Sequence, residues 1–308
     1  MRFFKFVFLL FSMLLTSCNN KTIKVVSYAN NYNEARSVAS ISKIMTAIIA
    51  IENANIYKEV IILKDGCNIP GSSIYLKENE KYQLIDLLYG LLLRSGNDAA
   101  ISIALAVSNS VDLFVDLMNQ KAKELTLTHT IFSNPTGLDE YDIGNISSCL
   151  DMAILYSYCM QNEVFSTIVS TKKYKNYTNK NKLIHSYPYC TGGKTGYTKK
   201  AKRTLISSAC KDDIDIIIVT LNLGNDFAFH KEIYEHYFSN YTAIKILNKG
   251  ENSFDNTIFY SDKNYYFITD KTNLTLSYYL YLNEKKIFII LKDQNNDEVD
   301  SITIDIFL

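Results

Sequence analysis

The sequence predicts an α+β fold: a large domain with an antiparallel sheet flanked by helices and a helical subdomain, followed by a small all-β domain. Two observations carry this prediction. Apolar residues at helical spacing dominate the chain up to about residue 160, and strand-like segments with short turns follow Cys190. From Ile244 the strands become shorter and rich in Tyr, Phe, Ile and Thr. We therefore divide the chain into residues 1–18, 19–242 and 243–308.

The first part of the large domain is predicted to be mainly helical. Residues 40–54 are apolar nearly all round, so we expect a buried helix there. Ser95-Gly96-Asn97 is expected to form a turn between two helices, where reactive side chains are readily presented. The expected helices after the first are 84–93, 98–107, 111–125 and 149–160.

Three strand candidates follow in close succession, at residues 192–198, 204–209 and 214–223. Their short connections predict antiparallel pairing, with the first strand at a sheet edge. A helix is expected at 227–238.

The composition is that of a folded protein without a strong charge bias. An apolar fraction of 47% is ample for a core. Lys+Arg and Asp+Glu both number 32, so the formal net charge is zero. Since no excess positive charge is available to neutralise phosphates, nucleic acid is not an expected partner.

The N-terminus reads as an export signal. Arg2 and Lys5 precede a short apolar run, Phe6 to Leu15, and small residues lead to Cys18. This run is shorter than the roughly 20 apolar residues that span a bilayer. Leu15-Thr16-Ser17-Cys18 matches a bacterial lipobox, which predicts a lipid on Cys18 and attachment to the outer face of the cytoplasmic membrane. The alternative is ordinary cleavage nearby, with Cys18 incidental and release to the periplasm or cell wall.

The other cysteines and the histidines show no metal-binding pattern. No C-x-x-C spacing occurs. Five cysteines lie beyond Cys18, and an odd number cannot form a complete disulfide framework. We expect buried thiols, especially at Cys149 and Cys159. His185 near Cys190 is a single pair, which is too little for a zinc site. We therefore expect no metal and no organic cofactor.

Three short motifs occur in a fixed order: Ser40-Ile41-Ser42-Lys43, Ser95-Gly96-Asn97 and Lys194-Thr195-Gly196. Two other Ser-x-x-Lys matches, at Ser170 to Lys173 and Ser208 to Lys211, lack this context. Alone, each motif is more often a helix start, an interhelix turn or a strand end. Together and in order, they are typical of serine enzymes that process or imitate D-Ala-D-Ala peptides.

The first motif has the residues that nucleophilic catalysis needs. Ser40 and Lys43 share one helix face, and a helix N-terminus favours a developing oxyanion. Lysine can act as a base only if its pKa falls far below about 10.4. Burial and a second cation, expected to be Lys194, would both lower it.

The other motifs supply proton transfer and substrate binding. Ser95 can pass a proton between Lys43 and the leaving nitrogen. Asn97 can donate its amide to a substrate carbonyl and hold Lys43 in place. An extended peptide could pair with the strand that carries Lys194, where Lys194 and Thr195 could bind a carboxylate. Gly196 lets the backbone approach closely.

The residues around these motifs resemble the D-alanyl-D-alanine carboxypeptidase family, which are low-molecular-mass penicillin-binding proteins. The resemblance covers about residues 25 to 240. The matching stretches are Ala39-Ser40-Ile41-Ser42-Lys43-Ile44-Met45-Thr46-Ala47, Gly71-Ser72-Ser73-Ile74-Tyr75-Leu76-Lys77, Asp86-Leu87-Leu88-Tyr89-Gly90-Leu91-Leu92, Ser95-Gly96-Asn97-Asp98-Ala99-Ala100, Asn134-Pro135-Thr136-Gly137-Leu138-Asp139 and Gly193-Lys194-Thr195-Gly196-Tyr197-Thr198.

The resemblance implies a β-lactamase/transpeptidase-like catalytic domain and a small C-terminal β domain. It implies Ser40 as the acylated nucleophile, Lys43 as base, Ser95 as proton shuttle and Lys194 as carboxylate binder. The backbone N–H groups of Ser40 and Tyr197 would form the oxyanion hole. The implied partners are peptidoglycan stem peptides ending in D-Ala-D-Ala, with β-lactams as inhibitors.

The chain departs from the family pattern at both ends. The family begins its catalytic domain with a hairpin whose second strand matches Ile23 to Tyr28, so the first would fall on Leu15 to Asn20, inside the export signal. Either that strand is lost on processing, or the N-terminus is not cut there. The family often ends in an amphipathic membrane helix, whereas Ser301 to Leu308 alternates like a strand. An N-terminal lipid could replace that anchor.

The leading prediction is an exported serine D,D-carboxypeptidase. A D,D-endopeptidase of the same family differs only on the acyl-acceptor side of the substrate. A class A-like β-lactamase needs a deacylating glutamate, and no Glu-x-x-Leu-Asn segment lies between Asn97 and Lys194. A non-catalytic wall-binding protein is disfavoured by the intact Ser40, Lys43 and Lys194.

Overall fold

The computed structural model forms two compact units. Of the described residues, the first unit contains 6–9, 31–139, 144–209 and 216–232, and the second contains 210–215 and those from 233 to 305. The residues that the structure describes are 6–9, 31–139, 144–254, 257–261, 264–271, 277–283, 286–292 and 295–305. The units divide at Glu232, ten residues before the boundary drawn from the sequence, which stays a prediction.

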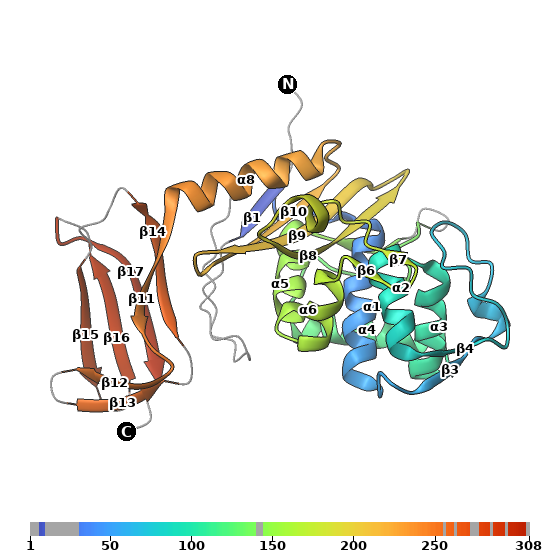
Figure 1. Ribbon diagram of the computed structural model, residues 1–308, viewed down its shortest axis with the longest axis horizontal. Coiled ribbons are helices and arrows are strands. Elements are labelled where there is room, and N and C mark those ends of the chain that lie inside the picture. Colours follow the sequence, from blue (N-terminus) through green and yellow to red (C-terminus); the bar gives the residue numbers. More distant parts are fainter. Residues whose placement is uncertain are drawn as a thin grey trace. The chain divides into compact units, whose positions relative to one another are not determined.

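A four-stranded sheet organises the first unit (Figure 1). Its strand order is β1-β10-β9-β8, so the strand with Lys194-Thr195-Gly196 lies at an edge, as predicted. β8 and β9 pair antiparallel, with Gly196 opposite Thr204. The strands are β1 (Phe6–Leu9), β8 (Cys190–Thr198), β9 (Lys202–Lys211) and β10 (Ile214–Leu221).

The strand β1 was not predicted. It pairs antiparallel with β10, although it falls in the apolar run that reads as an export signal. A short apolar run satisfies both patterns, because a buried strand and a signal core have similar composition. The positions predicted for the N-terminal hairpin, Leu15 to Asn20 and Ile23 to Tyr28, lie outside the described residues.

Helix α1 (Lys43–Asn53) forms the centre of the helical part, and every residue from Ile44 to Ala50 is buried, as predicted. It begins three residues later than expected, because Ala39–Ser42 form a 3₁₀ turn, η1. Ala39 is left-handed (φ 51°), and the Ser42 hydroxyl donates to the Ala39 carbonyl. Such a local side-chain bond competes with regular helix geometry.

The predicted turn at the second motif is confirmed. α2 (Leu84–Arg94) ends where Ser95 turns left-handed (φ 63°), and α3 (Asn97–Ser108) starts after Gly96. α4 (Val111–Glu124) begins at Ser110, whose hydroxyl accepts the N–H of Leu113. This is a standard N-cap.

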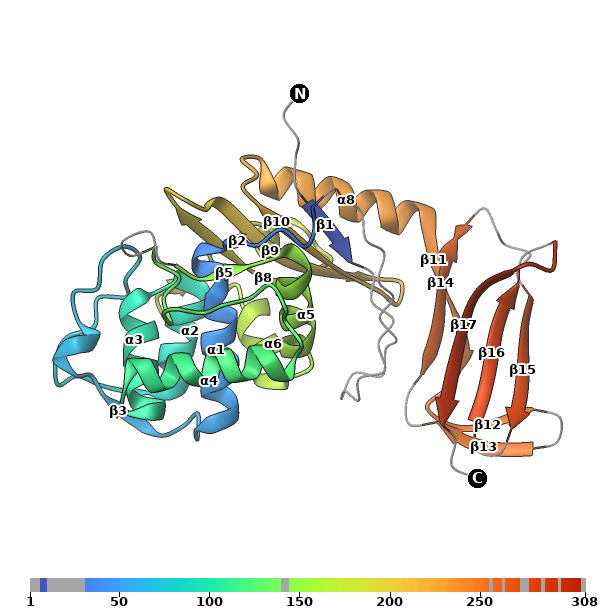
Figure 2. The same ribbon diagram turned by 180° about the vertical axis from the view of Figure 1, so that it is seen from behind.

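Helices cover both faces of the sheet. Figures 1 and 2 show α5 (Cys149–Met160) and α6 (Glu163–Ser170) on one face and the start of α8 (Asp226–Asn240) on the other. His230 of α8 is hydrogen-bonded to Ser207 (2.7 Å) and Thr220 (3.0 Å) of the sheet. α5 and α8 were predicted, whereas α6 and the short α7 (Leu183–Ser186) were not.

Three small strand pairs complete the first unit. One pair joins strands more than 100 positions apart, and the other two join strands that are closer in the sequence. The pairs are β2 (Arg36–Ser37) with β5 (Ile146–Ser147), β3 (Glu59–Ile61) with β4 (Lys81–Gln83), and β6 (Lys173–Tyr174) with β7 (Tyr177–Thr178).

The second unit contains antiparallel strands, as the sequence predicts. They pair as β11 with β14, β12 with β13, and β15-β16-β17. Their bounds are β11 (Tyr241–Leu247), β12 (Gly250–Phe254), β13 (Thr257–Ser261), β14 (Tyr265–Asp270), β15 (Ser277–Asn283), β16 (Lys286–Lys292) and β17 (Glu298–Asp305).

Among the described residues, no single helix is long and apolar enough to cross a membrane. Helices α3 and α4 together have the length and composition of a membrane span, but they are bent by 87° relative to one another. Cys149 and Cys159 are buried, as predicted, and no disulfide joins any two described cysteines.

Candidate active site

The turn η1 brings Ser40 and Lys43 together. In a 3₁₀ turn, residues i and i+3 lie directly above one another, which aligns the two side chains. The Lys43 Nζ lies 2.9 Å from the Ser40 Oγ. Ser40 is half-buried, whereas Lys43 is fully buried. The nucleophile candidate is therefore open to a substrate, while its neighbour is shielded from water.

The Lys43 amine has two more neighbours, the Asn97 Oδ1 at 2.7 Å and the carbonyl oxygen of Thr136. Both can only accept hydrogen bonds. A neutral amine has two N–H groups and one lone pair, so donation to these two oxygens leaves the lone pair for the Ser40 hydroxyl. The three contacts suit a neutral lysine that receives a proton from Ser40.

The environment of Lys43 lowers its pKa to about 7. Burial is the main cause, the nearby Lys180 ammonium adds to it, and the Asp98 carboxylate opposes it. The sequence predicted burial correctly and named Lys194 as the second cation. Lys180 was missed, because it belongs to no motif.

The second and third motifs meet at one hydrogen bond. The Lys194 Nζ donates to the Ser95 Oγ (2.9 Å) and to the carbonyl oxygen of Thr195 (2.7 Å). Both side chains are buried. Burial, together with the charges of Lys43 and Lys180, holds the pKa of Lys194 well below its usual value. The lowered pKa favours the neutral form of the Lys194 amine, and this amine holds the Ser95 hydroxyl.

Gly196 explains how β8 approaches Ser40. A Cβ on Gly196 would lie 2.9 Å from the Ser40 nitrogen, 3.1 Å from the Ile41 nitrogen, and in conflict with the Thr204 hydroxyl. Any side chain there would fill the space beside the Ser40 amide. Tyr197, the next residue, has a ring that is 63% exposed.

The Asn134–Gly137 turn positions the Thr136 carbonyl. The Asn134 Oδ1 accepts hydrogen bonds from the Thr136 and Gly137 N–H groups, in an Asx-type turn. Gly137 (φ 78°) packs against the Ala39 carbonyl, where a Cβ could not fit. The residues Asn134-Pro135-Thr136-Gly137 predict this turn from the sequence, and the structure confirms it. Sequence reasoning did not connect Thr136 with Lys43.

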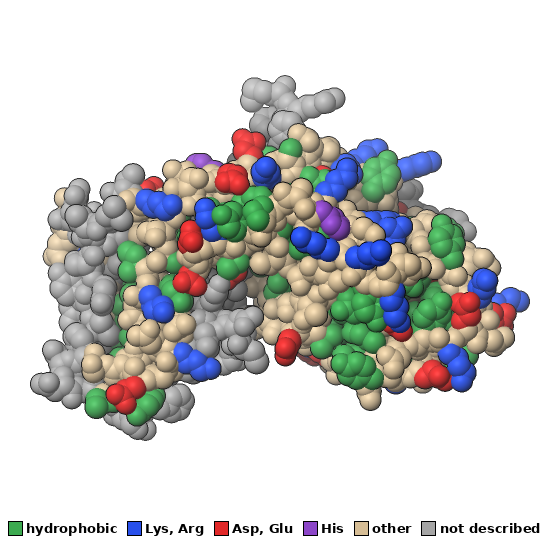
Figure 3. Space-filling model, in the orientation of Figure 1, with side chains coloured by type: hydrophobic (Ala, Val, Ile, Leu, Met, Phe, Trp, Pro, Cys, Tyr) green, Lys and Arg blue, Asp and Glu red, His purple; other side chains and the backbone are tan. Residues whose placement is uncertain are grey.

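Lys180, the cation that acts on Lys43 and Lys194, belongs to a lysine-rich segment. Segment 172–182 contains five exposed lysines and no acidic residue, and Figure 3 shows blue side chains gathering over the region of β6 and β7. Lys180 is one of them. Among the described residues, no three His, Cys, Asp or Glu side chains cluster as metal ligands.

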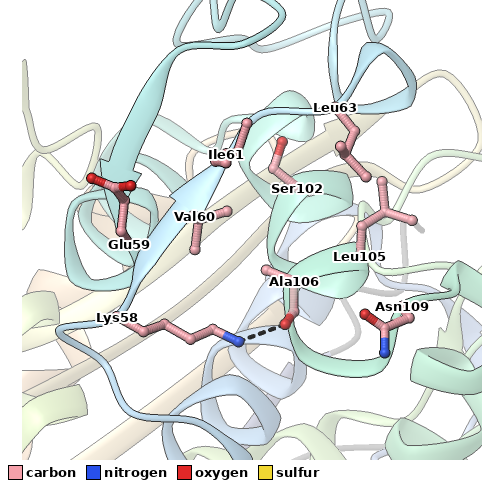
Figure 4. A pocket seen from close by; sticks show the side chains of 9 residues that line it. All are labelled: Lys58, Glu59, Val60, Ile61, Leu63, Ser102, Leu105, Ala106 and Asn109. Atoms are coloured by element: carbon pink, nitrogen blue, oxygen red, sulfur yellow. Dashed lines mark hydrogen bonds between the residues drawn. The ribbon is translucent and has the colours of Figure 1, made fainter.

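A pocket of about 280 Å³ lies elsewhere, between β3 and α3 (Figure 4). Lys58 closes one end by donating to the Ala106 carbonyl (2.6 Å), which belongs to the last turns of α3. None of the residues that line it belongs to the three motifs. The reactive groups therefore lie outside this pocket.

Residues 13–225 match the sequence profile of D-alanyl-D-alanine carboxypeptidase. The chain belongs to this family. The family membership predicted from the sequence is thereby confirmed. Among curated relatives, the chain is 35% identical over 259 residues to the D-alanyl-D-alanine carboxypeptidase DacF of Bacillus subtilis, covering 74% of this chain and 66% of the relative. It is 31% identical to DacD of Escherichia coli, covering 76% and 65%. The chain thus spans just under two thirds of these relatives' length.

Solved structures of the carboxypeptidase family share the fold. Penicillin binding protein 5 from Haemophilus influenzae superposes with a TM-score of 0.81 at 22% identity, covering 99% of this chain and 96% of that one. DacD from Francisella tularensis gives 0.77 at 21% identity, covering 100% and 93%. The predicted fold class, a β-lactamase/transpeptidase-like domain with a small β domain, is confirmed.

Proposed function

We propose that this protein is an exported serine D,D-carboxypeptidase that removes the terminal D-Ala from peptidoglycan stem peptides. The observation that carries the proposal is the triple contact of the Lys43 amine with Ser40, Asn97 and Thr136. Family membership supports the same reaction class. The reaction needs neither a metal nor an organic cofactor.

Acylation begins when the Ser40 Oγ attacks the carbonyl carbon of the penultimate D-Ala and Lys43 takes its proton. The carbonyl π electrons move to oxygen, and the N–H groups of Ser40 and Tyr197 donate to the resulting oxyanion. The C–N bond then breaks, and Ser95 passes a proton to the leaving nitrogen. Water hydrolyses the ester, and Ser40 regains its proton.

Substrate binding would use the open edge of β8. The stem peptide adds to this edge as an extended strand, and the Asn97 amide holds a substrate carbonyl. Thr195 and Lys194 bind the terminal carboxylate, whose negative charge favours the protonated form of Lys194 in the complex. The proximity of Gly196 to the Ser40 amide supports this arrangement, because the strand then lies beside the oxyanion donor.

Mass spectrometry after incubation with penicillin tests the proposal. Penicillin should add its mass to Ser40, and the adduct should persist because no deacylating glutamate was identified. Ser40→Ala should abolish labelling. Ser170→Ala is a matched control, since Ser170 also begins a Ser-x-x-Lys match but is exposed at the end of α6. Full labelling of Ser40→Ala would refute the proposal.

Three alternatives remain distinct in their products. A D,D-endopeptidase would release monomers from cross-linked dimers faster than it trims a stem pentapeptide. A class A-like β-lactamase would turn penicillin over instead of retaining it. A non-catalytic wall-binding protein would take no label. We expect release of D-Ala from the pentapeptide to be the fastest peptide reaction.

We also propose that Cys18 carries a lipid that attaches the protein to the outer face of the cytoplasmic membrane. The lipobox match Leu15 to Cys18 motivates this. Processing at Cys18 would remove residues 1–17, so the lipidated protein would lack β1 and β10 would lie at an edge of the sheet. Two acyl chains hold a protein stably, whereas one holds only marginally. Fractionation and mass analysis should find a lipidated wild type and a released Cys18→Ala protein. Equal membrane association without lipid would indicate a signal of the ordinary or uncleaved type.

A further inference from the structure

The loop Ser72–Leu76 is fastened to the start of α3 by the carboxylate of Asp98. This carboxylate accepts hydrogen bonds from the Ser73 hydroxyl (2.5 Å) and from the N–H groups of Ile74 (3.0 Å) and Leu76 (3.1 Å). Asp98 is 1% exposed. A buried carboxylate with several donors is a strong anchor, because hydrogen bonds to a charged group are stronger than neutral ones.

A cation holds the same loop at Ser72. The Lys180 Nζ donates to the Ser72 hydroxyl at 2.9 Å, across 108 positions of the sequence. The Lys180 N–H in turn donates to the Leu93 carbonyl (3.0 Å), near the end of α2. Two adjacent hydroxyls, Ser72 and Ser73, are therefore bound to opposite charges.

The loop contacts Asn97 directly. The Ser72 carbonyl accepts the Asn97 N–H (2.7 Å), and the Pro70 carbonyl accepts the Asn97 Nδ2 (2.6 Å). The other end of that amide, Oδ1, binds Lys43. The loop holds the Asn97 backbone through Ser72, and Pro70, which leads into the loop, fixes which end of the amide faces Lys43.

Contacts with Asp98 determine the backbone conformation of the Ser72–Leu76 loop. Tyr75 is left-handed (φ 65°) although its ring is 83% exposed, so no packing of the ring explains the backbone strain. Such strain persists only where the surroundings determine it. Here the N–H groups on both sides of Tyr75, those of Ile74 and Leu76, are bound to Asp98.

We propose that Asp98 and Lys180 are positioning residues that hold the Ser72–Leu76 loop at separate points and thereby fix Asn97 against Lys43. This inference rests on the proposed function, in which Lys43 is the base. Neither residue contacts the reacting atoms, and both act through the loop.

The two anchors have opposite electrostatic effects on Lys43. The Lys180 charge lowers the pKa of Lys43, and the Asp98 charge raises it. Of the other charged groups on neighbouring elements, Lys194 of β8 is hydrogen-bonded to Ser95, and Asp139 accepts from Ser37 and Thr198. A purely structural role for the anchors would not predict opposite shifts.

The experiment measures the rate of penicillin acylation against pH for Lys180→Met and Asp98→Asn. We expect both variants to slow acylation about tenfold at the optimum, since loss of positioning of this kind costs up to about 10²-fold. The rising limb of the acylation rate against pH reports the pKa of Lys43. It should move to higher pH by up to about one unit in Lys180→Met, and to lower pH in Asp98→Asn. Lys180→Arg should restore the limb position.

Lys182→Met is the matched control, because Lys182 is an exposed lysine of the same segment that stacks near Phe227 instead of the loop. It should behave as wild type. If Asp98→Asn does not fold, Ser73→Ala removes one contact of the same carboxylate and must slow acylation. Wild-type rates in Lys180→Met, or limb shifts of the same direction in both variants, would overturn the inference. Failure of the wild type to acylate would instead refute the proposed function.

Discussion

The two ends of helix α1 shift the pKa of a nearby lysine in opposite directions. At the C-terminal end, Glu52 pairs with Lys121 of α4 at 2.9 Å, and Glu124 pairs with the same ammonium at 2.9 Å. Although burial alone would lower it, hydrogen bonds to Glu124 and Glu52 raise the pKa of Lys121. At the start of the helix, Lys43 has a hydroxyl and two carbonyl oxygens as partners, and its pKa is lowered to about 7.

This difference teaches what makes a buried lysine a base. Lys43 has three oxygen partners and Lys121 has two, so a larger number of contacts does not by itself keep a lysine charged. The two amines differ in burial, which is complete for Lys43 and partial for Lys121, and in the charge of their acceptors. Neutral acceptors leave the cost of burying an ammonium uncompensated, which favours the neutral amine. The active site therefore depends on the exclusion of carboxylates from direct contact with Lys43.

The largest expected effect comes from fixing a charge at Lys43. Arginine stays protonated in proteins, so Lys43→Arg cannot accept the Ser40 proton. We expect acylation to fall by about 10²–10⁴-fold, the usual contribution of a general base. Lys121→Arg keeps its ion pairs and should leave acylation unchanged. Stopped-flow labelling with a fluorescent penicillin measures both, and retention of most activity in Lys43→Arg would remove Lys43 from the mechanism.

A carboxylate introduced beside Lys43 should raise its pKa, so that Lys43 resembles Lys121. Asn97→Asp would place a negative charge where the amide oxygen now lies, 2.7 Å from the Lys43 Nζ. An opposite charge at this distance raises the pKa of a lysine by about 1–3 units. Acylation at pH 7 should fall about tenfold or more and recover at higher pH. A loss that is independent of pH would instead indicate misplacement of Lys43.

The pH dependence of the wild type sharpens the same comparison. Below about pH 7, Lys43 is increasingly protonated and cannot take the Ser40 proton. Acylation should therefore decline about tenfold per pH unit on the acidic side and level off above pH 7. A profile that keeps rising to pH 10 would show that Lys43 has an ordinary pKa.

His230 extends the comparison to stability. Burial lowers the pKa of His230 from 6.5 to about 3, with Ser207 and Thr220 as hydroxyl partners. As pH falls from 6.5 towards 3, the unfolded chain binds a proton that the folded protein does not, so stability is lost in this window. The loss is of the order of 4–5 kcal/mol.

Chemical denaturation at pH 7 and pH 4.5 measures the part of this loss that falls between pH 6.5 and 4.5, which is about 2–3 kcal/mol. His230→Gln should lose less stability between the two values than the wild type. His236→Gln, which changes an exposed histidine of the same helix, should lose as much as the wild type. Equal losses in all three proteins would contradict the assignment to His230.

The smallest effect is expected from the ion pairs at the end of α1. Lys121→Met removes both, and pairs near the surface contribute about 0.2–1 kcal/mol each. Thermal unfolding should shift by a few degrees at most, and less at high salt. Penicillin acylation should not change, because this end of the helix has no contact with the site. A large loss of acylation would show that the two ends are coupled.

The sequence predicted those parts of the fold and site that depend on local pattern. Apolar periodicity located α1 to α5 and α8, and the motifs located Ser40, Lys43, Ser95, Asn97 and Lys194, which the structure brings together. The roles of these residues stay predictions until they are tested.

The features that were missed depend on contacts between distant segments. Lys180 meets Ser72 across 108 positions, and the Thr136 carbonyl meets Lys43 across 93. A backbone carbonyl has no signature in the sequence, and Lys180 is one of several lysines in its segment. The 3₁₀ turn at Ser40 depends on Ala39 adopting a left-handed conformation, which alanine seldom does.

The most direct test of the central claim is an NMR titration of the lysine side chains in the unliganded protein. Spectra of protein with labelled lysine, assigned with Lys43→Arg and Lys121→Arg, follow each amine from pH 5 to 10. We predict that Lys43 titrates near pH 7 while Lys121 remains protonated throughout. A Lys43 amine that shows no titration up to pH 10 would contradict the account, because the base would then be charged at neutral pH.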